Sequence, residues 1–183
     1  METRERIEEL ERQLNEMKAS LKEEAKNDRP ITERVKTFED AVYVLGNGHP
    51  FVQQYDAIVY DEVNRDNADL IAYYKLRIIT AVLNEGWEPE FTEDEWRYYP
   101  WFYLYTQEEW DKLSEEQKKG GVLFGGSAYG GAGAGFVCAS SNSAPSGAFA
   151  YFGSHLCFKT DALARYAGRQ FAALYADYLL VRK

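Results

Sequence analysis

"LFGGSAYGGAGAGFVCASSNSAPSGAFAYFGSHLCFKT", residues 123–160, has a composition unlike that of the rest of the chain. The protein is 28% charged overall, yet Asp, Glu, Lys and Arg are all absent between Gly120 and Phe158. Glycine costs about 1 kcal/mol in a helix interior, so the run is not expected to be helical. Flexible linkers are polar and lack regularly spaced aromatic residues. We therefore expect closely packed loops and short strands.

Small residues recur through this run as a rough frame, and a different set of residues lies between them. We expect the frame to pack the backbone and the intervening residues to face a ligand. Tyr, Ser, Gly and Asn also dominate antibody paratopes, where Tyr gives contact area at a low entropy cost. The intervening residues, called the display positions below, are Tyr129, Gly130, Gly133, Ser140, Ser141, Asn142, Ser143, Gly147, Phe149, Tyr151 and Phe152.

The display positions also share a property of their codons. Each residue can be reached from an Asn codon ending in a pyrimidine, or from an Ile codon for Phe152, by changing adenines alone. Lys, Glu, Gln, Met and Trp cannot be reached in this way, and all of them are missing from the run. Low sequence complexity would produce the same absence.

Residues 123–160 resemble the C-terminal variable region of diversity-generating retroelement target proteins, whose adenine-templated codons are rewritten by an error-prone reverse transcriptase. The flanking segments "KLRIITAVLNEGWEPEFTEDEWRYYPWFYLYT" (75–106) and "LCFKTDALARYAGRQFAALYADYLL" (156–180) are similar to the invariant flanks of a gut-bacterial and phage branch of this family. The resemblance covers residues 31–183. His155 stands where the family pattern "GSRLCF" has Arg, so it is either substituted or diversified.

The resemblance implies an α+β fold: a C-type-lectin-like domain over residues 31–183, with a small antiparallel sheet, two helices and a variable region at about 125–157. It implies binding to a cell-surface protein or glycan through the display positions and His155. Relatives in the family act as phage receptor-binding proteins or surface adhesins. The expected location is therefore a phage tail or fibre, or otherwise the cytoplasm or cell surface. The alternative is a structural virion protein whose Gly/Ala run packs against neighbouring subunits.

The N-terminal 28 residues have the pattern of a coiled coil. Their apolar residues alternate spacings of three and four, which is the a/d repeat of a heptad seam. Either this segment self-associates as a dimer or trimer, or it is a single solvated helix. Residues 26–30, "KNDRP", are expected to end the helix and form a hinge. The seam residues are Ile7, Leu10, Leu14, Met17 and Leu21.

Composition excludes several classes of function. A net charge of −9 argues against nucleic acid and anionic membranes as partners. No apolar run approaches the roughly 20 residues of a membrane span, and a charged N-terminus is not typical of a signal peptide. Calcium sites need several oxygen ligands, usually carboxylates, and the display run has none. We expect neither metal nor cofactor.

An enzyme is the competing hypothesis, because formylglycine-generating oxidases share the lectin-like fold and use cysteines. The chain has only Cys138 and Cys157, and only His49 and His155 as histidines. Without an acid–base constellation among them, we expect no catalytic activity. The two thiols are expected to be reduced and buried, and the alternative is a disulfide between them.

Helix signals recur through the remaining sequence. Thr37 is expected to cap a short helix that ends at Gly46, a longer helix is expected over 68–85, and Thr160 is expected to cap a C-terminal helix. Capping boxes beginning at Thr92 and Thr106 predict two helical turns around a strand at 97–105. Pro100 restricts that strand to a sheet edge or a bend, and we expect its aromatic residues to serve mostly core and cross-strand packing. Residues 178–183 are expected to form a short strand.

Overall fold

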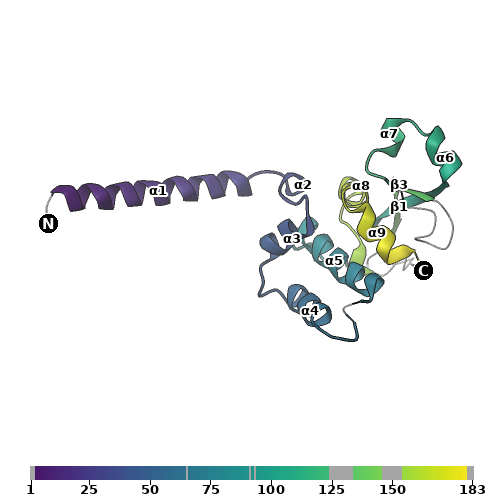
Figure 1. Cartoon of the computed structure of the whole chain (residues 1–183), viewed down its shortest axis with the longest axis horizontal. Coiled ribbons are helices and arrows are strands. Elements are labelled where there is room, and N and C mark those ends of the chain that lie inside the picture. The colour runs from purple at the N-terminus through teal and green to yellow at the C-terminus, as the bar shows by residue number, and fades with distance from the viewer. Residues whose placement is uncertain are drawn as a thin grey trace. The chain divides into compact units, whose positions relative to one another are not determined.

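The computed structural model describes residues 3–64, 66–90, 92, 94–123, 134–145 and 154–180 (Figure 1). The chain divides into two compact units, Met1–Arg34 and Val35–Lys183. The boundary lies a few residues after the predicted hinge. The protein is a mixed α+β structure, as the sequence predicted.

The first unit is mainly one long helix. α1 (Thr3–Asn27) is followed by a single turn, α2 (Ile31–Arg34). All five residues of the predicted seam are exposed, between 46% for Leu14 and 63% for Leu21. Glu9 and Arg12 form an ion pair at 2.9 Å on the polar surface of the helix.

The second unit begins with three helices, α3 (Phe38–Leu45), α4 (Pro50–Val59) and α5 (Ala68–Leu83). Thr37 caps α3 in a capping box with Asp40, and Gly46 ends it at φ 87°, which confirms the prediction for this helix. α4 is an addition to the predicted helices, because the composition of "GNGHPF" (46–51) predicts only a turn. The helix starts there because Pro50 occupies its first turn, where the missing N–H costs nothing, and His49 Nδ1 accepts a hydrogen bond from the Phe51 N–H.

A three-stranded antiparallel sheet is formed by β1 (Trp96–Thr106), β2 (Val122–Leu123) and β3 (Ala134–Pro145), in the order β1-β3-β2. β1 lies at the edge of this three-stranded order, which is one of the two positions that Pro100 allows. Phe158 extends the sheet by a single bridge to Tyr98 on the outer side of β1. The backbone N–H groups of alternate residues point to the same edge of a strand, and the Tyr98 N–H points outward to Phe158. The backbone nitrogen of Pro100 therefore also points outward, where its missing N–H removes no hydrogen bond to β3.

The aromatic residues of β1 are less buried than predicted. Among them only Tyr99 is buried, at 4% exposed, whereas Trp96, Trp101 and Tyr103 are exposed. The predicted core position is therefore wrong for Trp101 and Tyr103, and Trp96 precedes the predicted strand. Among the described residues, the largest fully buried side chain is instead that of Arg97.

Two short helices lie between β1 and β2 in the chain. α6 (Gln107–Lys112) starts in the capping box of Thr106 and Glu109, as predicted. α7 (Glu115–Lys118) starts in a further capping box, that of Ser114 and Gln117, where the polar sequence "LSEEQKKGG" (113–121) predicts only a surface turn. Thr92 accepts a hydrogen bond from the Glu95 N–H at 3.3 Å, but no helix follows among the described residues there, so that predicted turn is wrong.

The C-terminal segment forms η1 (Ser154–Leu156), α8 (Asp161–Gln170) and α9 (Ala172–Leu179). Thr160 caps α8, as predicted. The predicted strand at 178–183 is wrong at its start, because Tyr178 and Leu179 continue α9, and residues 181–183 lie outside the described part. α8 and α9 contact both the sheet and α5, and the core lies between these layers (Figure 1).

Candidate functional site

The described structure includes part of the predicted binding site. Ser140, Ser141, Asn142 and Ser143 lie in the second half of β3, and His155 lies in η1. The remaining predicted positions lie outside the described residues: Tyr129, Gly130, Gly133, Gly147, Phe149, Tyr151 and Phe152.

The four β3 residues are fixed in register against β1. Ser140 pairs with Trp101 and Ser143 pairs with Tyr98. The register shifts between Trp101 and Phe102, whose partner is Cys138, so Ala139 is the additional residue of a β-bulge. Bulges re-aim the side chains that follow them, and this one directly precedes the display positions of β3. Ser143 is exposed, and Ser140 and Ser141 are half-buried.

Ser141 is bound to the start of α8. Its hydroxyl donates a hydrogen bond to Asp161 Oδ1, and Arg165 Nε donates to Asp161 Oδ2 at 2.8 Å. Both hydrogen bonds lower the pKa of the Asp161 carboxyl, and the one from Arg165 has the larger effect. Ser141 is therefore held by the frame of the domain. The four-residue spacing of Asp161 and Arg165 is the signal that predicts their ion pair, whereas nothing in the sequence pairs them with Ser141.

The end of the display run is anchored from two sides. Tyr98 and Phe158 exchange two backbone hydrogen bonds, at 3.0 and 2.9 Å. On the other side, Asn84 Nδ2 donates to the Cys157 carbonyl at 2.8 Å, and Asn84 Oδ1 accepts from the Lys159 N–H at 3.1 Å. The chain after exposed His155 is thus fixed both to β1 and to the C-terminal end of α5.

The two cysteines are buried and form no disulfide. Burial raises the pKa of both thiols, that of Cys157 to about 11. Thiols with raised pKa values are protonated at neutral pH and are poor nucleophiles. Cys138 packs instead against the backbone of α8, since a Cβ on Gly168 would overlap its Sγ. Within the described ranges, no group of three or more His, Cys, Asp or Glu side chains is placed to hold a metal ion.

Comparisons with known proteins found no relative, so the site is interpreted from its geometry. No family model, no curated protein and no solved structure matches this chain. Among the described helices, none combines the length and apolar character needed to cross a membrane.

Proposed function

We propose that the second unit is a C-type-lectin-like domain whose variable region, at about 125–157, binds a cell-surface protein or glycan and is diversified by a retroelement. The observation that carries the proposal is the uncharged run between Gly120 and Phe158, together with the anchoring of its two described ends. β3 is paired on both sides, with β1 and β2, and residues 157–159 are bound by β1 and Asn84. A rigid frame of this kind lets the residues between its ends vary without loss of the fold.

The exposed residues at these ends have the chemistry of a recognition surface. Ser143 and His155 are exposed, and Ser140 is half-buried beside exposed Trp101. Hydroxyl groups adapt as donors or acceptors, and aromatic rings supply contact area at low entropy cost. This combination supports a binding protein, either a phage receptor-binding protein on a tail or fibre or a surface adhesin.

A direct test is binding to an array of glycans and cell-surface proteins. Replacing Phe149 and Tyr151 together by Ser is expected to weaken binding by about 2 kcal/mol or more, since aromatic anchors carry most interface energy. The matched control replaces Tyr43 and Tyr60 by Ser, because these exposed aromatic residues, at 65% and 83%, lie on the helical part of the domain. Equal binding by the wild type and the Phe149/Tyr151 variant would show that the run is not the paratope. Binding of no array member by any variant would favour the structural virion protein.

We further propose that α1 assembles the protein as a dimer or trimer through a coiled coil. Its seam residues are exposed along the helix, and burying them against another copy removes apolar surface from water. Several weak binding sites on one assembly gain avidity without new contacts.

Deleting residues 1–28 is expected to reduce the assembly to a monomer with an unchanged fold of the second unit. Light scattering measures the mass of the assembly, to be compared with 21.0 kDa for one full-length chain. In the full-length chain, Leu10→Ser with Leu14→Ser is expected to have the same effect, because both residues lie on the seam. The control, Gln13→Ser with Glu16→Ser, changes neighbouring residues off the seam and is expected to leave the mass unchanged. A monomeric wild type would contradict the proposed coiled coil.

A further inference from the structure

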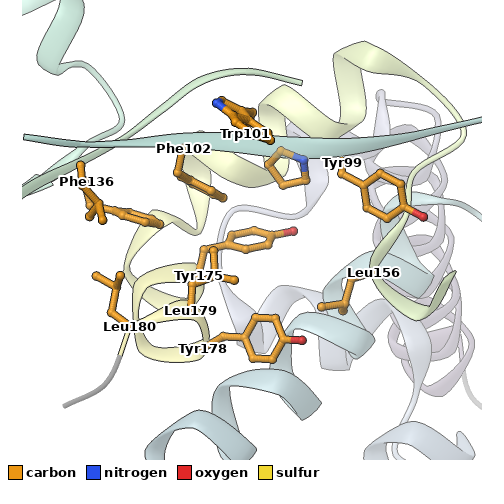
Figure 2. Close-up of a pocket in the computed structure, with 11 residues that line it drawn as sticks. Tyr99, Trp101, Phe102, Phe136, Leu156, Tyr175, Tyr178, Leu179 and Leu180 are labelled. Carbon is orange, nitrogen blue, oxygen red and sulfur yellow. The ribbon is translucent and has the colours of Figure 1, made fainter. Parts of the chain in front are cut away.

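Several polar groups of the second unit are shielded from chemical reaction. Burial keeps both thiols protonated at neutral pH, and the Asn84 amide holds two hydrogen bonds in the core. The Tyr175 hydroxyl has less than 1 Å² of exposed surface, and Figure 2 shows its ring among the side chains that line an apolar groove between β1 and α9. The Asn47 side chain differs from these groups, because it is exposed and makes no hydrogen bond among the described residues.

Asn47 lies in the middle of the turn that connects α3 to α4. The His49 N–H donates to the Gly46 carbonyl at 3.0 Å, which places Asn47 and Gly48 at the two central positions of a β-turn. Both ends of this turn are fixed, since Gly46 ends α3 and His49 caps α4. The two central residues are exposed and donate no hydrogen bond within the described part of the chain. No hydrogen bond therefore has to break when the peptide between them rotates.

The surroundings of Gly48 leave its backbone nitrogen accessible to the Asn47 side chain. A Cβ built on Gly48 would meet nothing within 4 Å, so the space around this residue is open. Glycine carries no side chain that would shield the nitrogen, and its backbone adopts conformations that other residues avoid. The nitrogen that follows an asparagine closes a five-membered ring when it bonds to the side-chain carbonyl carbon. Gly48 is thus the least hindered residue that could follow Asn47 for this ring closure.

We propose that Asn47 is a site of spontaneous deamidation. The Gly48 nitrogen gives up its proton and attacks Cγ of Asn47, and the new N–Cγ bond closes a succinimide ring. The Cγ–Nδ2 bond breaks, and the side-chain nitrogen takes up a proton and leaves as ammonia. Water then adds to one of the two ring carbonyls, which yields Asp or isoaspartate at residue 47. Water is the only co-reactant, and nothing is oxidised or reduced.

The products change the start of α4 in two ways. Each adds one negative charge to a chain with a net charge of −9, and places it two residues before the N-cap His49. A helix N-terminus favours negative charge, so the Asp form is expected to keep the fold. Isoaspartate also adds a methylene group to the main chain, inside the turn that the hydrogen bond from His49 to Gly46 closes. This site is separate from the proposed binding surface, and neither proposal depends on the other.

The test is to incubate the full chain at neutral and at mildly alkaline pH and to map its proteolytic peptides by mass spectrometry. An isoaspartyl-specific methyltransferase labels the isoaspartate. We expect acid to accumulate at residue 47, and faster at alkaline pH because the attacking nitrogen must lose its proton. Asn67 is the internal control, since it is also exposed and its side chain makes no cap hydrogen bond. The next residue, Ala68, has a Cβ and begins α5, so Asn67 is expected to remain an amide over the same period.

Two variants show whether the glycine is the cause. Gly48→Ala is expected to slow the reaction about tenfold, because a modest rise in the barrier has a large effect on the rate. Asn47→Asp supplies the charged product as a reference for ion-exchange chromatography. An unchanged rate in Gly48→Ala, or equal conversion of Asn67 and Asn47, would overturn the proposal. Absence of acid at residue 47 in the native chain would also overturn it, and a reaction in the urea-unfolded chain alone would show that the turn holds the two groups apart.

Discussion

Gly135→Ala is expected to lower the free energy of unfolding of the second unit by about 3 kcal/mol, at the upper end of the usual cost of overpacking. Gly135 lies in β3, and the indole of Trp110 on α6 occupies the space where a Cβ would be. A methyl group there would overlap Cε3 and stand 2.6 Å from Cδ2 of the ring. Trp110 is 8% exposed, so the ring has little room to move aside. Urea denaturation followed by circular dichroism measures the change.

Two controls show whether this contact is the cause. Gly48→Ala adds the same methyl group at a turn where nothing lies within 4 Å, and it is expected to be neutral. Trp110→Leu is expected to be destabilising alone because it leaves a cavity, but to recover part of the loss when it is combined with Gly135→Ala. Equal stability of the wild type and Gly135→Ala would mean that Trp110 is not packed on this glycine.

Asn84→Ala is expected to cost about 3 kcal/mol of stability. The Asn84 side chain is 3% exposed and makes the two hydrogen bonds to the Cys157 carbonyl and the Lys159 N–H. Its removal leaves both of these backbone groups without that partner, and each unsatisfied buried group costs about 1–3 kcal/mol. Urea denaturation again measures the total, and hydrogen exchange at the Lys159 amide reports the local effect.

The matched control for Asn84→Ala is Asn64→Ala. The Asn64 side chain also donates a hydrogen bond, to Asp61 Oδ1 at 3.0 Å, but it does so in an exposed turn. Water replaces that bond, so a loss of a few tenths of a kcal/mol is expected. A similar loss in both variants would show that Asn84 does not hold the segment after the display run. A large loss at Asn84 with fast exchange at Lys159 would identify this amide as an anchor of the candidate binding surface.

The sequence predicted those elements whose signals act within a few residues. Thr37, Thr106 and Thr160 each cap a helix as predicted, because a cap is a hydrogen bond to a backbone N–H only three residues away. The edge position of β1 is one of the two alternatives that Pro100 allowed, for an equally local reason. The exposed apolar seam of α1 was likewise predicted from a local pattern, the alternating spacing of three and four residues.

The helix faces were less predictable than the helices. Leu76 and Ile79 of α5 are almost fully buried, although they lie off the apolar stripe that helical spacing predicts for this helix: Leu70, Ile71, Tyr74, Ile78, Val82 and Leu83. Helical spacing identifies one face, but α5 contacts α3, α4, α9 and η1, so it is buried on more than one side. The C-terminal helix was predicted without the interruption at Phe171, which separates α8 from α9.

The sequence alone determined the class of the fold, the caps of its helices and the uncharged run that marks the candidate site. The tertiary structure decided which distant groups meet: Trp110 on Gly135, Ser141 at Asp161, and Asn84 on a carbonyl 73 residues away. It also buried the Tyr175 hydroxyl without a hydrogen-bond partner among the described residues. The physical reason is one of range. Capping and periodicity depend on neighbours within one or two turns, whereas burial, close backbone approach and cavities depend on segments that only folding brings together.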